Sequence, residues 1–167
     1  MDPDSINLGL AVLRVTVGVT LALHGIAKFR GGIRGVGNWF ASEGLRPGLL
    51  HAYLAALTEI GAGIGLALGL LTPLSSMAVI GVMTTAGWVG HRHNGFFIIR
   101  EGWEYVFVLA VVAAAVAATG PGDWSVDNAI GLDWSGPIWF AVAIVGGLVS
   151  TILLLAACYR PDVGAEK

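Results

Sequence analysis

The sequence predicts an all-α membrane protein with five transmembrane helices in a single domain, residues 1–167. Hydrophobic residues make up 56% of the chain and charged residues only 12%, whereas soluble domains carry roughly 25% charged residues. So few polar side chains cannot coat a water-soluble globule. The hydrophobic residues also gather into five stretches, and the lysines and arginines fall almost entirely on one side of them.

Composition also excludes several classes of function. The formal net charge of −2 gives no basis for nucleic-acid binding. The single cysteine, Cys158, excludes an internal disulfide, a CxxC redox pair and a cluster held by several cysteines. No nucleotide-binding motif is present.

Each of the five stretches approaches the roughly 17–25 apolar residues that a helix needs to cross a bilayer. Leu71-Thr-Pro73 joins the second and third so tightly that they must form an antiparallel hairpin, with the proline in the first turn of the third helix. We expect spans at residues 6–29, 49–70, 73–90, 103–119 and 137–159.

The distribution of charges predicts the orientation, because lysine and arginine accumulate in cytoplasmic loops. With the N-terminus outside, every cation except Arg14 lies inside: Lys28, Arg30, Arg34, Arg46, Arg92, Arg100, Arg160 and Lys167. The outer segments instead carry Asp2, Asp4, Asp123, Asp127 and Asp133. Tryptophans fall near both interfaces, at positions 39, 88 and 103 inside and 124, 134 and 139 outside. We therefore expect the N-terminus outside and the C-terminus in the cytoplasm.

Two loops carry structure of their own. Ile33, Val36 and Phe40 recur at helical spacing, which predicts a short amphipathic helix in the inner interface. The four glycines at positions 31, 32, 35 and 37 favour a loop instead, and both interpretations stay open. In the segment 120–128, Ser125 and Asp127 are placed to cap or brace a turn.

A charged residue inside a span destabilises the protein in the membrane unless it faces the bundle interior and pairs with another polar group. Arg14 lies about 12 Å into the first predicted helix, at 1.5 Å per residue, and Glu59 reaches a similar depth from the opposite side. We therefore expect a structural ion pair between Arg14 and Glu59.

The inner half of the bundle collects further polar side chains near one depth. Arg14, His24 and Lys28 share one face of the first helix, and the candidate ligand-binding residues are His24, Lys28, Glu59, His91 and Glu104. One interpretation is structural, since buried pairs often fix helix packing alone. The other is a polar pocket for an amphipathic ligand. A quinone suits it, because its carbonyl groups need donors and its protons need carboxylates.

Metal and haem fit the histidines less well than a quinone fits the pocket. His91 and His93 stand two residues apart and so do not share a helix face, which disfavours a metal site. Haem held by two histidines from His24, His51, His91 and His93 fits less well than the quinone, and His51 is interpreted as a first-turn interfacial residue. We expect no metal and identify no haem motif.

The motifs of the chain resemble those of the DoxX family of small membrane proteins. These are Arg14, His24-Gly-X-X-Lys28-Phe29, Glu59, Gly69-Leu-Leu-Thr-Pro73, Asn94-Gly-Phe-Phe, Glu104-Tyr105 and Gly120-Pro-Gly-Asp-Trp-Ser-Val-Asp127. The resemblance covers about residues 8–130 and implies a four-helix transmembrane bundle. The span at 137–159 would then be a fifth, C-terminal helix.

Some DoxX-family proteins resemble membrane subunits of quinone-linked oxidoreductases. The resemblance therefore implies a multi-pass protein of the bacterial plasma membrane that works with other redox subunits or as a homo-oligomer. The expected function is that of an oxidoreductase subunit with quinone as its cofactor, rather than a self-sufficient enzyme. A non-catalytic anchor subunit and a component of a small-molecule or lipid transporter remain alternatives.

Overall fold

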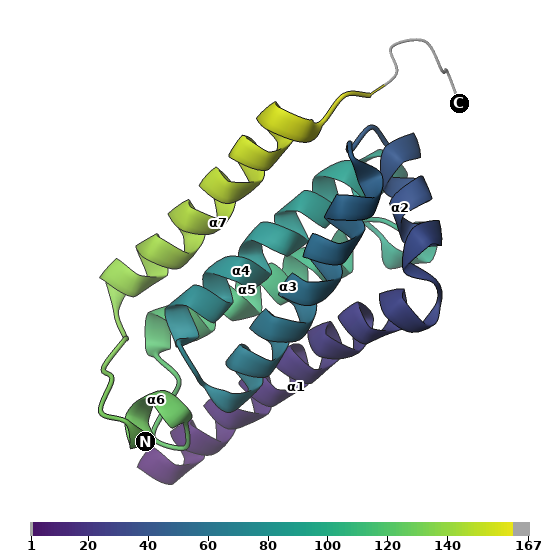
Figure 1. Ribbon diagram of the computed structural model, residues 1–167. Helices are drawn as coiled ribbons and strands as arrows, with labels where there is room; N and C mark the ends of the chain where they lie inside the picture. Colours follow the sequence, from purple (N-terminus) through teal and green to yellow (C-terminus); the bar gives the residue numbers. More distant parts are fainter. Residues whose placement is uncertain (1, 162–167) are drawn as a thin grey trace.

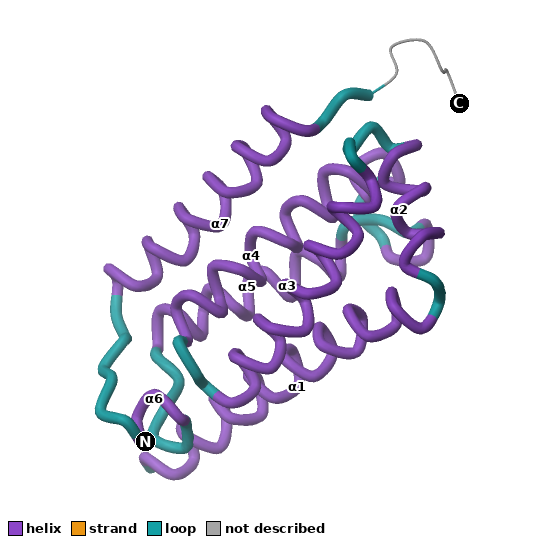
Figure 2. Tube along the Cα trace, in the orientation of Figure 1, coloured by secondary structure: helices purple, strands orange, loops and turns teal. Residues whose placement is uncertain are grey.

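The computed structural model describes residues 2–161, and this part of the chain is helical, without a strand (Figures 1 and 2). The long helices run up and down between two ends of the bundle. Beyond them, a single pair of residues, Leu45 and Tyr159, forms an isolated antiparallel bridge. The elements in chain order are α1 (Pro3–Arg30), α2 (Ile33–Ser42), α3 (Gly48–Leu68), α4 (Thr72–Ala86), η1 (Gly87–His91), η2 (Arg92–Asn94), η3 (Ile98–Arg100), α5 (Glu104–Thr119), α6 (Val126–Ala129) and α7 (Pro137–Cys158).

We call the two ends the α2 end and the α6 end, after the short helices that lie there (Figure 1). α1 runs from the α6 end to the α2 end, and α3, α4, α5 and α7 follow in alternating directions. The loops that carry lysine and arginine therefore meet at the α2 end, and Asp123, Asp127 and Asp133 lie at the α6 end. Lys167, expected beside the other cations, lies outside the described residues.

Within residues 2–161, four helical segments are long and apolar enough to cross a membrane: Pro3–Arg30, Gly48–Leu68, Thr72–Asn94 and Pro137–Cys158. The expected span at 103–119 forms the apolar helix α5, which has only 16 residues. At 1.5 Å per residue α5 is about 24 Å long, less than the roughly 30 Å of a typical hydrocarbon core. A fifth full-length span is therefore not confirmed.

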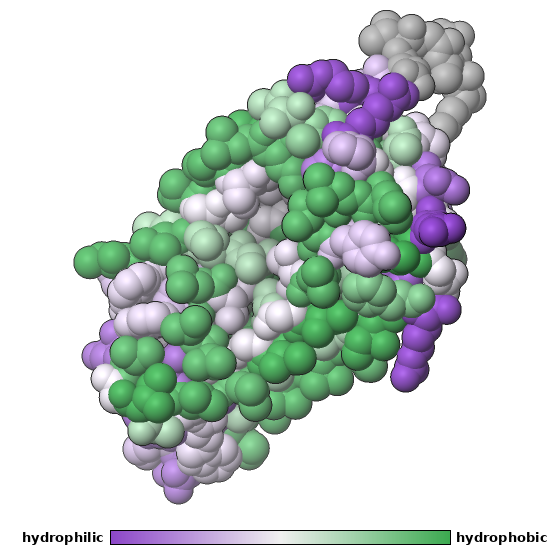
Figure 3. Space-filling view, in the orientation of Figure 1, coloured by the Kyte–Doolittle hydropathy of each residue, from purple (hydrophilic) through white to green (hydrophobic). Residues whose placement is uncertain are grey.

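The outer surface of the helices is apolar, as contact with lipid requires. Leu23 of α1, Leu57 of α3 and Ile152 of α7 are each more than half exposed, at 56%, 58% and 63%. Figure 3 shows these hydrophobic surfaces in green along the bundle, with hydrophilic atoms in purple near its two ends. This pattern is that of a multi-pass membrane protein.

Glycines set the register between α1 and α3. A Cβ atom on Gly18 would lie 2.7 Å from the backbone nitrogen of Ala67, and one on Gly63 would lie 2.7 Å from that of Ala22. Gly25 comes as close, since its Cβ would lie 2.5 Å from the carbonyl oxygen of Ala56. Only glycine allows the two backbones to approach in this way.

The segment after α1 is a helix, α2, which settles the choice between helix and glycine-rich loop. Ile33 and Val36 pack with the buried Phe40, Ala52 and Val89, so the apolar face of α2 lies against the protein. At the same end, α4 continues into the π-helix η1. Trp39 of α2 passes so close to Gly90 that a Cβ there would lie 2.8 Å from the indole ring. His91 is the last residue of η1 and is partly buried.

Candidate functional site

An ion pair joins α1 to α3 inside the bundle. The Lys28 ammonium lies 2.5 Å from a carboxylate oxygen of Glu59, and the side chains are 22% and 6% exposed. The expected partner of Glu59 was Arg14, and that prediction is wrong. The glycine-determined register places Arg14 level with Ala67, eight residues or about 12 Å along α3 from Glu59.

Arg14 instead belongs to a polar cluster at the α6 end. Its guanidinium donates to the carbonyl oxygens of Trp124, at 2.6 Å, and Ala67, at 3.4 Å. Asp127, which has no exposed surface, accepts hydrogen bonds from the backbone nitrogens of Leu71 and Thr72 and from the Thr72 hydroxyl. Asp127 therefore braces the turn between α3 and α4, while Ser125 caps α6 by accepting from the Asn128 nitrogen. This cluster is structural.

The Lys28–Glu59 pair lines a cavity of about 130 Å³ between α1, α3, α4 and α5. Four of the five predicted ligand-binding residues, namely His24, Lys28, Glu59 and His91, reach this inner cavity, as does Tyr105. Most of the remaining lining is apolar: Leu21, Trp39, Phe40, Ala55, Val82, Met83, Ala86 and Leu109. The inner cavity thus combines hydrogen-bonding groups with a hydrophobic wall.

Tyr105 links the two histidines of the inner cavity. The Nδ1 atom of His91 lies 2.7 Å from the carbonyl oxygen of Glu101, which can only accept, so we assign a proton to this nitrogen. In the neutral ring, Nε2 then accepts from the Tyr105 hydroxyl at 3.1 Å. His24 stacks against Tyr105 with ring centroids 6.3 Å apart, and its Nδ1 donates to the carbonyl oxygen of Thr20. The Nε2 atom of a neutral His24 is therefore an acceptor.

A second, polar cavity of about 820 Å³ opens at the α2 end and shares Trp39 and His91 with the inner cavity. We call it the polar mouth. Its lining includes Glu43, Arg92, His93 and Glu101. His91 therefore stands between the polar mouth and the inner cavity, in hydrogen-bond contact with Tyr105 on the inner side.

Glu104 was also predicted in the site, but it does not line the inner cavity. Its carboxylate accepts a hydrogen bond from the backbone nitrogen of Ile98 and so holds the loop before α5. His93 is exposed and contacts Arg92. His51, expected at the interface, is 95% buried and lines a different cavity, described below. No three His, Cys, Asp or Glu side chains converge for metal binding within residues 2–161.

Tyr105 was missed as a site residue, although it stands beside Glu104 in one of the motifs. Its hydroxyl, next to Glu104 at the start of a helix that is apolar from Val106 to Ala118, is the signal that could have identified it. The direction of the side chain depends on where α5 begins, and Glu104 is the first residue of that helix. The neighbouring Tyr105, about 100° further around α5, faces inward.

Fold and site together define a helical, multi-pass membrane protein with a polar cavity inside an apolar bundle. The DoxX family model matches residues 9–92, and the chain belongs to this family. It is also 33% identical over 118 residues to a Bacillus subtilis (strain 168) protein described as "Putative oxidoreductase CatD". That alignment covers 69% of this chain and 83% of the relative. No solved structure matches the chain.

Proposed function

We propose that this protein is the membrane subunit of an oxidoreductase and that its inner cavity receives the head group of a quinone. The observation that carries the proposal is the Lys28–Glu59 pair beside His24, His91 and Tyr105 in a cavity with apolar walls. The description of the Bacillus subtilis relative as an oxidoreductase supports the class of function.

The chemistry of the cavity suits a ring with two carbonyl groups. The ammonium group of Lys28 has three hydrogens, of which the contact with Glu59 uses one, so it can donate to a carbonyl oxygen. A protonated His24 can donate from Nε2, whereas a neutral one can accept from a quinol hydroxyl. Low local polarity strengthens each of these bonds. A quinone supplies two-electron redox chemistry coupled to proton uptake.

The polar mouth provides a route for these protons. His91 connects it to Tyr105, and Glu59 lines the inner cavity as an acceptor paired with Lys28. We propose that the α2 end, where the cations gather, faces the cytoplasm of a bacterial cell. Protons would then come from the cytoplasmic side.

The electrons would come from a partner. With a single cysteine, the chain cannot itself hold a cluster ligated by several cysteines. A partner subunit that meets the α2 end, next to the polar mouth, would place its redox centre nearest to the inner cavity.

The test is a titration of the protein in nanodiscs with a decyl-substituted benzoquinone, followed by quenching of tryptophan fluorescence, because Trp39 lines the inner cavity. We expect His24→Ala to weaken binding about tenfold, or about 1.4 kcal/mol. Tyr105→Phe removes one neutral hydrogen bond and should cost about threefold. Glu104→Gln is the matched control and should bind normally, because Glu104 lies outside the cavity.

Thermal unfolding is measured in parallel for each variant. Unchanged quinone affinity in well-folded His24→Ala and Tyr105→Phe proteins would reject the proposal. The inner cluster would then serve packing alone, and a non-catalytic anchor subunit would be the better description.

A further inference from the structure

A third cavity, of about 300 Å³, lies between α3, α4 and α7 and is distinct from the inner cavity and the polar mouth. α4 forms its floor, and α3 and α7 form its walls. Figure 3 shows the opening as a pale recess between the green surfaces of α3 and α7, so it faces the lipid. We call it the lateral groove. It touches the inner cavity through a shared wall of Phe40, Ala55, Val82 and Thr85.

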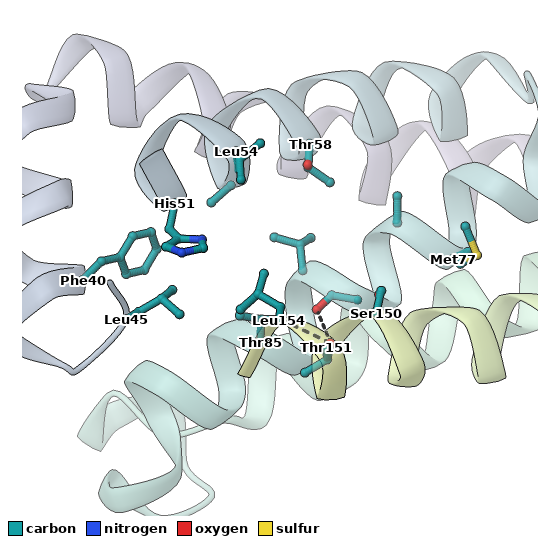
Figure 4. A pocket seen from close by; sticks show the side chains of 14 residues that line it. Phe40, Leu45, His51, Leu54, Thr58, Met77, Thr85, Ser150, Thr151 and Leu154 are labelled. Atoms are coloured by element: carbon teal, nitrogen blue, oxygen red, sulfur yellow. Dashed lines mark hydrogen bonds between the residues drawn. The ribbon is translucent and has the colours of Figure 1, made fainter. Parts of the chain in front are cut away.

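His51 is the unusual residue of the lateral groove. It comes from the first turn of α3, is 95% buried next to Phe40 and Leu45, and points into the groove (Figure 4). Neither ring nitrogen of His51 has a hydrogen-bond partner among the described residues. Buried polar groups in native proteins are nearly always hydrogen-bonded, so an orphaned imidazole requires an explanation.

The hydroxyl groups on the opposite wall are already engaged. Thr151 donates to the carbonyl oxygen of Gly81 and accepts from Thr85, and Ser150 donates to the carbonyl oxygen of Gly147. A ligand in the lateral groove therefore finds its polar partners on α3, where Thr58 lines the groove and both ring nitrogens of the buried His51 lack a partner among the described residues. The rest of the lining is mostly hydrocarbon and extends along α4 from Thr85 to Met77, about 12 Å at 1.5 Å per residue.

The lining also limits the chemistry of the ligand. Among residues 2–161, no lysine, arginine, aspartate or glutamate faces the lateral groove, so a charged head would remain unpaired in a low-dielectric site. A neutral imidazole has one donor and one acceptor nitrogen, and a hydroxyl group can bond to either. We propose that the lateral groove binds one bilayer lipid with an uncharged hydroxyl head on His51 and its hydrocarbon chain along α4.

The test uses three probes with the same chain and different heads: hexadecanol, hexadecyl sulfate and hexadecane. Each competes with a hexadecanol that carries a diazirine on its chain, and cross-linked residues are located by mass spectrometry on the full chain in nanodiscs. We expect cross-links on α3, α4 and α7 within the lateral groove. Hexadecanol should compete at least about tenfold better than the other two probes.

Two variants and a control probe the site. His51→Phe keeps an aromatic ring and removes both nitrogens, so it should reduce the preference for hexadecanol about tenfold. Ala78→Phe fills the lateral groove and should abolish labelling there. His93→Phe makes the same chemical change at an exposed position outside the lateral groove and should leave the preference for hexadecanol unchanged. Elution profile and thermal unfolding establish that each variant is folded.

Equal competition by hexadecane would show an apolar gap without a head-group site, and stronger competition by hexadecyl sulfate would show an anion site. Either result would overturn the proposal. It would also be overturned by labelling spread over the whole lipid-facing surface, or by a His51→Phe protein that prefers hexadecanol as strongly as before. The test uses no quinone, so its failure would leave the proposal for the inner cavity unchanged.

Discussion

Lys28 and Glu59 pair across the α1–α3 interface one helical turn from Gly25, the glycine that lets the two backbones meet. The close packing and the ion pair therefore depend on each other. The Glu59 side chain is almost completely buried, at 6% exposed, whereas that of Lys28 is 22% exposed. Breaking the pair is therefore more costly for the buried carboxylate than for the partly exposed ammonium group.

The first prediction concerns this pair. Lys28→Met should destabilise the bundle by about 3–5 kcal/mol, because it leaves a buried carboxylate without its cation. Adding Glu59→Leu should recover much of this loss, because no buried charge remains. The measurement is the free energy of unfolding in a denaturing detergent titration. A double variant as unstable as the sum of the two single variants would show that the groups do not interact.

The second prediction concerns Asp127 at the α6 end. Asp127→Asn should cost about 3 kcal/mol, because an amide places an NH₂ group against donors from Leu71 or Thr72 and gives up hydrogen bonds to a charged acceptor. Asp133→Asn is the control, since Asp133 is exposed and accepts only from Ser135 in the described structure. Equal unfolding temperatures for the two variants would contradict the bracing role.

The third prediction compares two glycines of α1. Gly18→Ala should destabilise the protein by about 1–3 kcal/mol, because the new methyl group meets the backbone of α3. Gly9→Ala should be neutral or stabilising by up to about 1 kcal/mol, because nothing lies within 4 Å of its Cβ and alanine favours the helix. The measurement is the free energy of unfolding of each variant. Changes of the same sign and size in the two variants would contradict the observed register between α1 and α3.

The fourth prediction concerns orientation. In a Cys158→Ala background, a cysteine at Ser135 should react with a membrane-impermeant maleimide added to intact cells, and a cysteine at Ser42 should react only after lysis. Both serines are exposed and lie at opposite ends of the bundle. The reverse labelling pattern would place the α2 end outside.

The helical fold and the gathering of the loop cations at one end could be predicted from the sequence, because apolar length and loop charge are local properties of the chain. The register between α1 and α3 did not follow. Depth counted from predicted helix ends matched Arg14 to Glu59, whereas the observed register is fixed by where Gly18, Gly25 and Gly63 allow contact. The predicted register was wrong by eight residues along α3, and it therefore paired Glu59 with Arg14 instead of Lys28.

The histidines show the same limit. His24 and His91 were expected in one site and reach one cavity. His51 was interpreted as interfacial because it opens a helix, but α2 folds back and covers it with Phe40. Burial produced by a neighbouring element cannot be deduced from the position of a residue within its own helix.

The short length of α5 has a consequence for the surrounding lipid. Phe107, Val108 and Val111 on its outer face are about half exposed and must meet acyl chains. A helix about 6 Å shorter than the hydrocarbon core leaves a hydrophobic mismatch, which the bilayer relieves by thinning on that side. The membrane would form a dimple beside α5, bringing lipid head groups closer to Trp103 and to the cavity that Tyr105 lines. Bilayers of short-chain lipids should accommodate the protein with the least deformation.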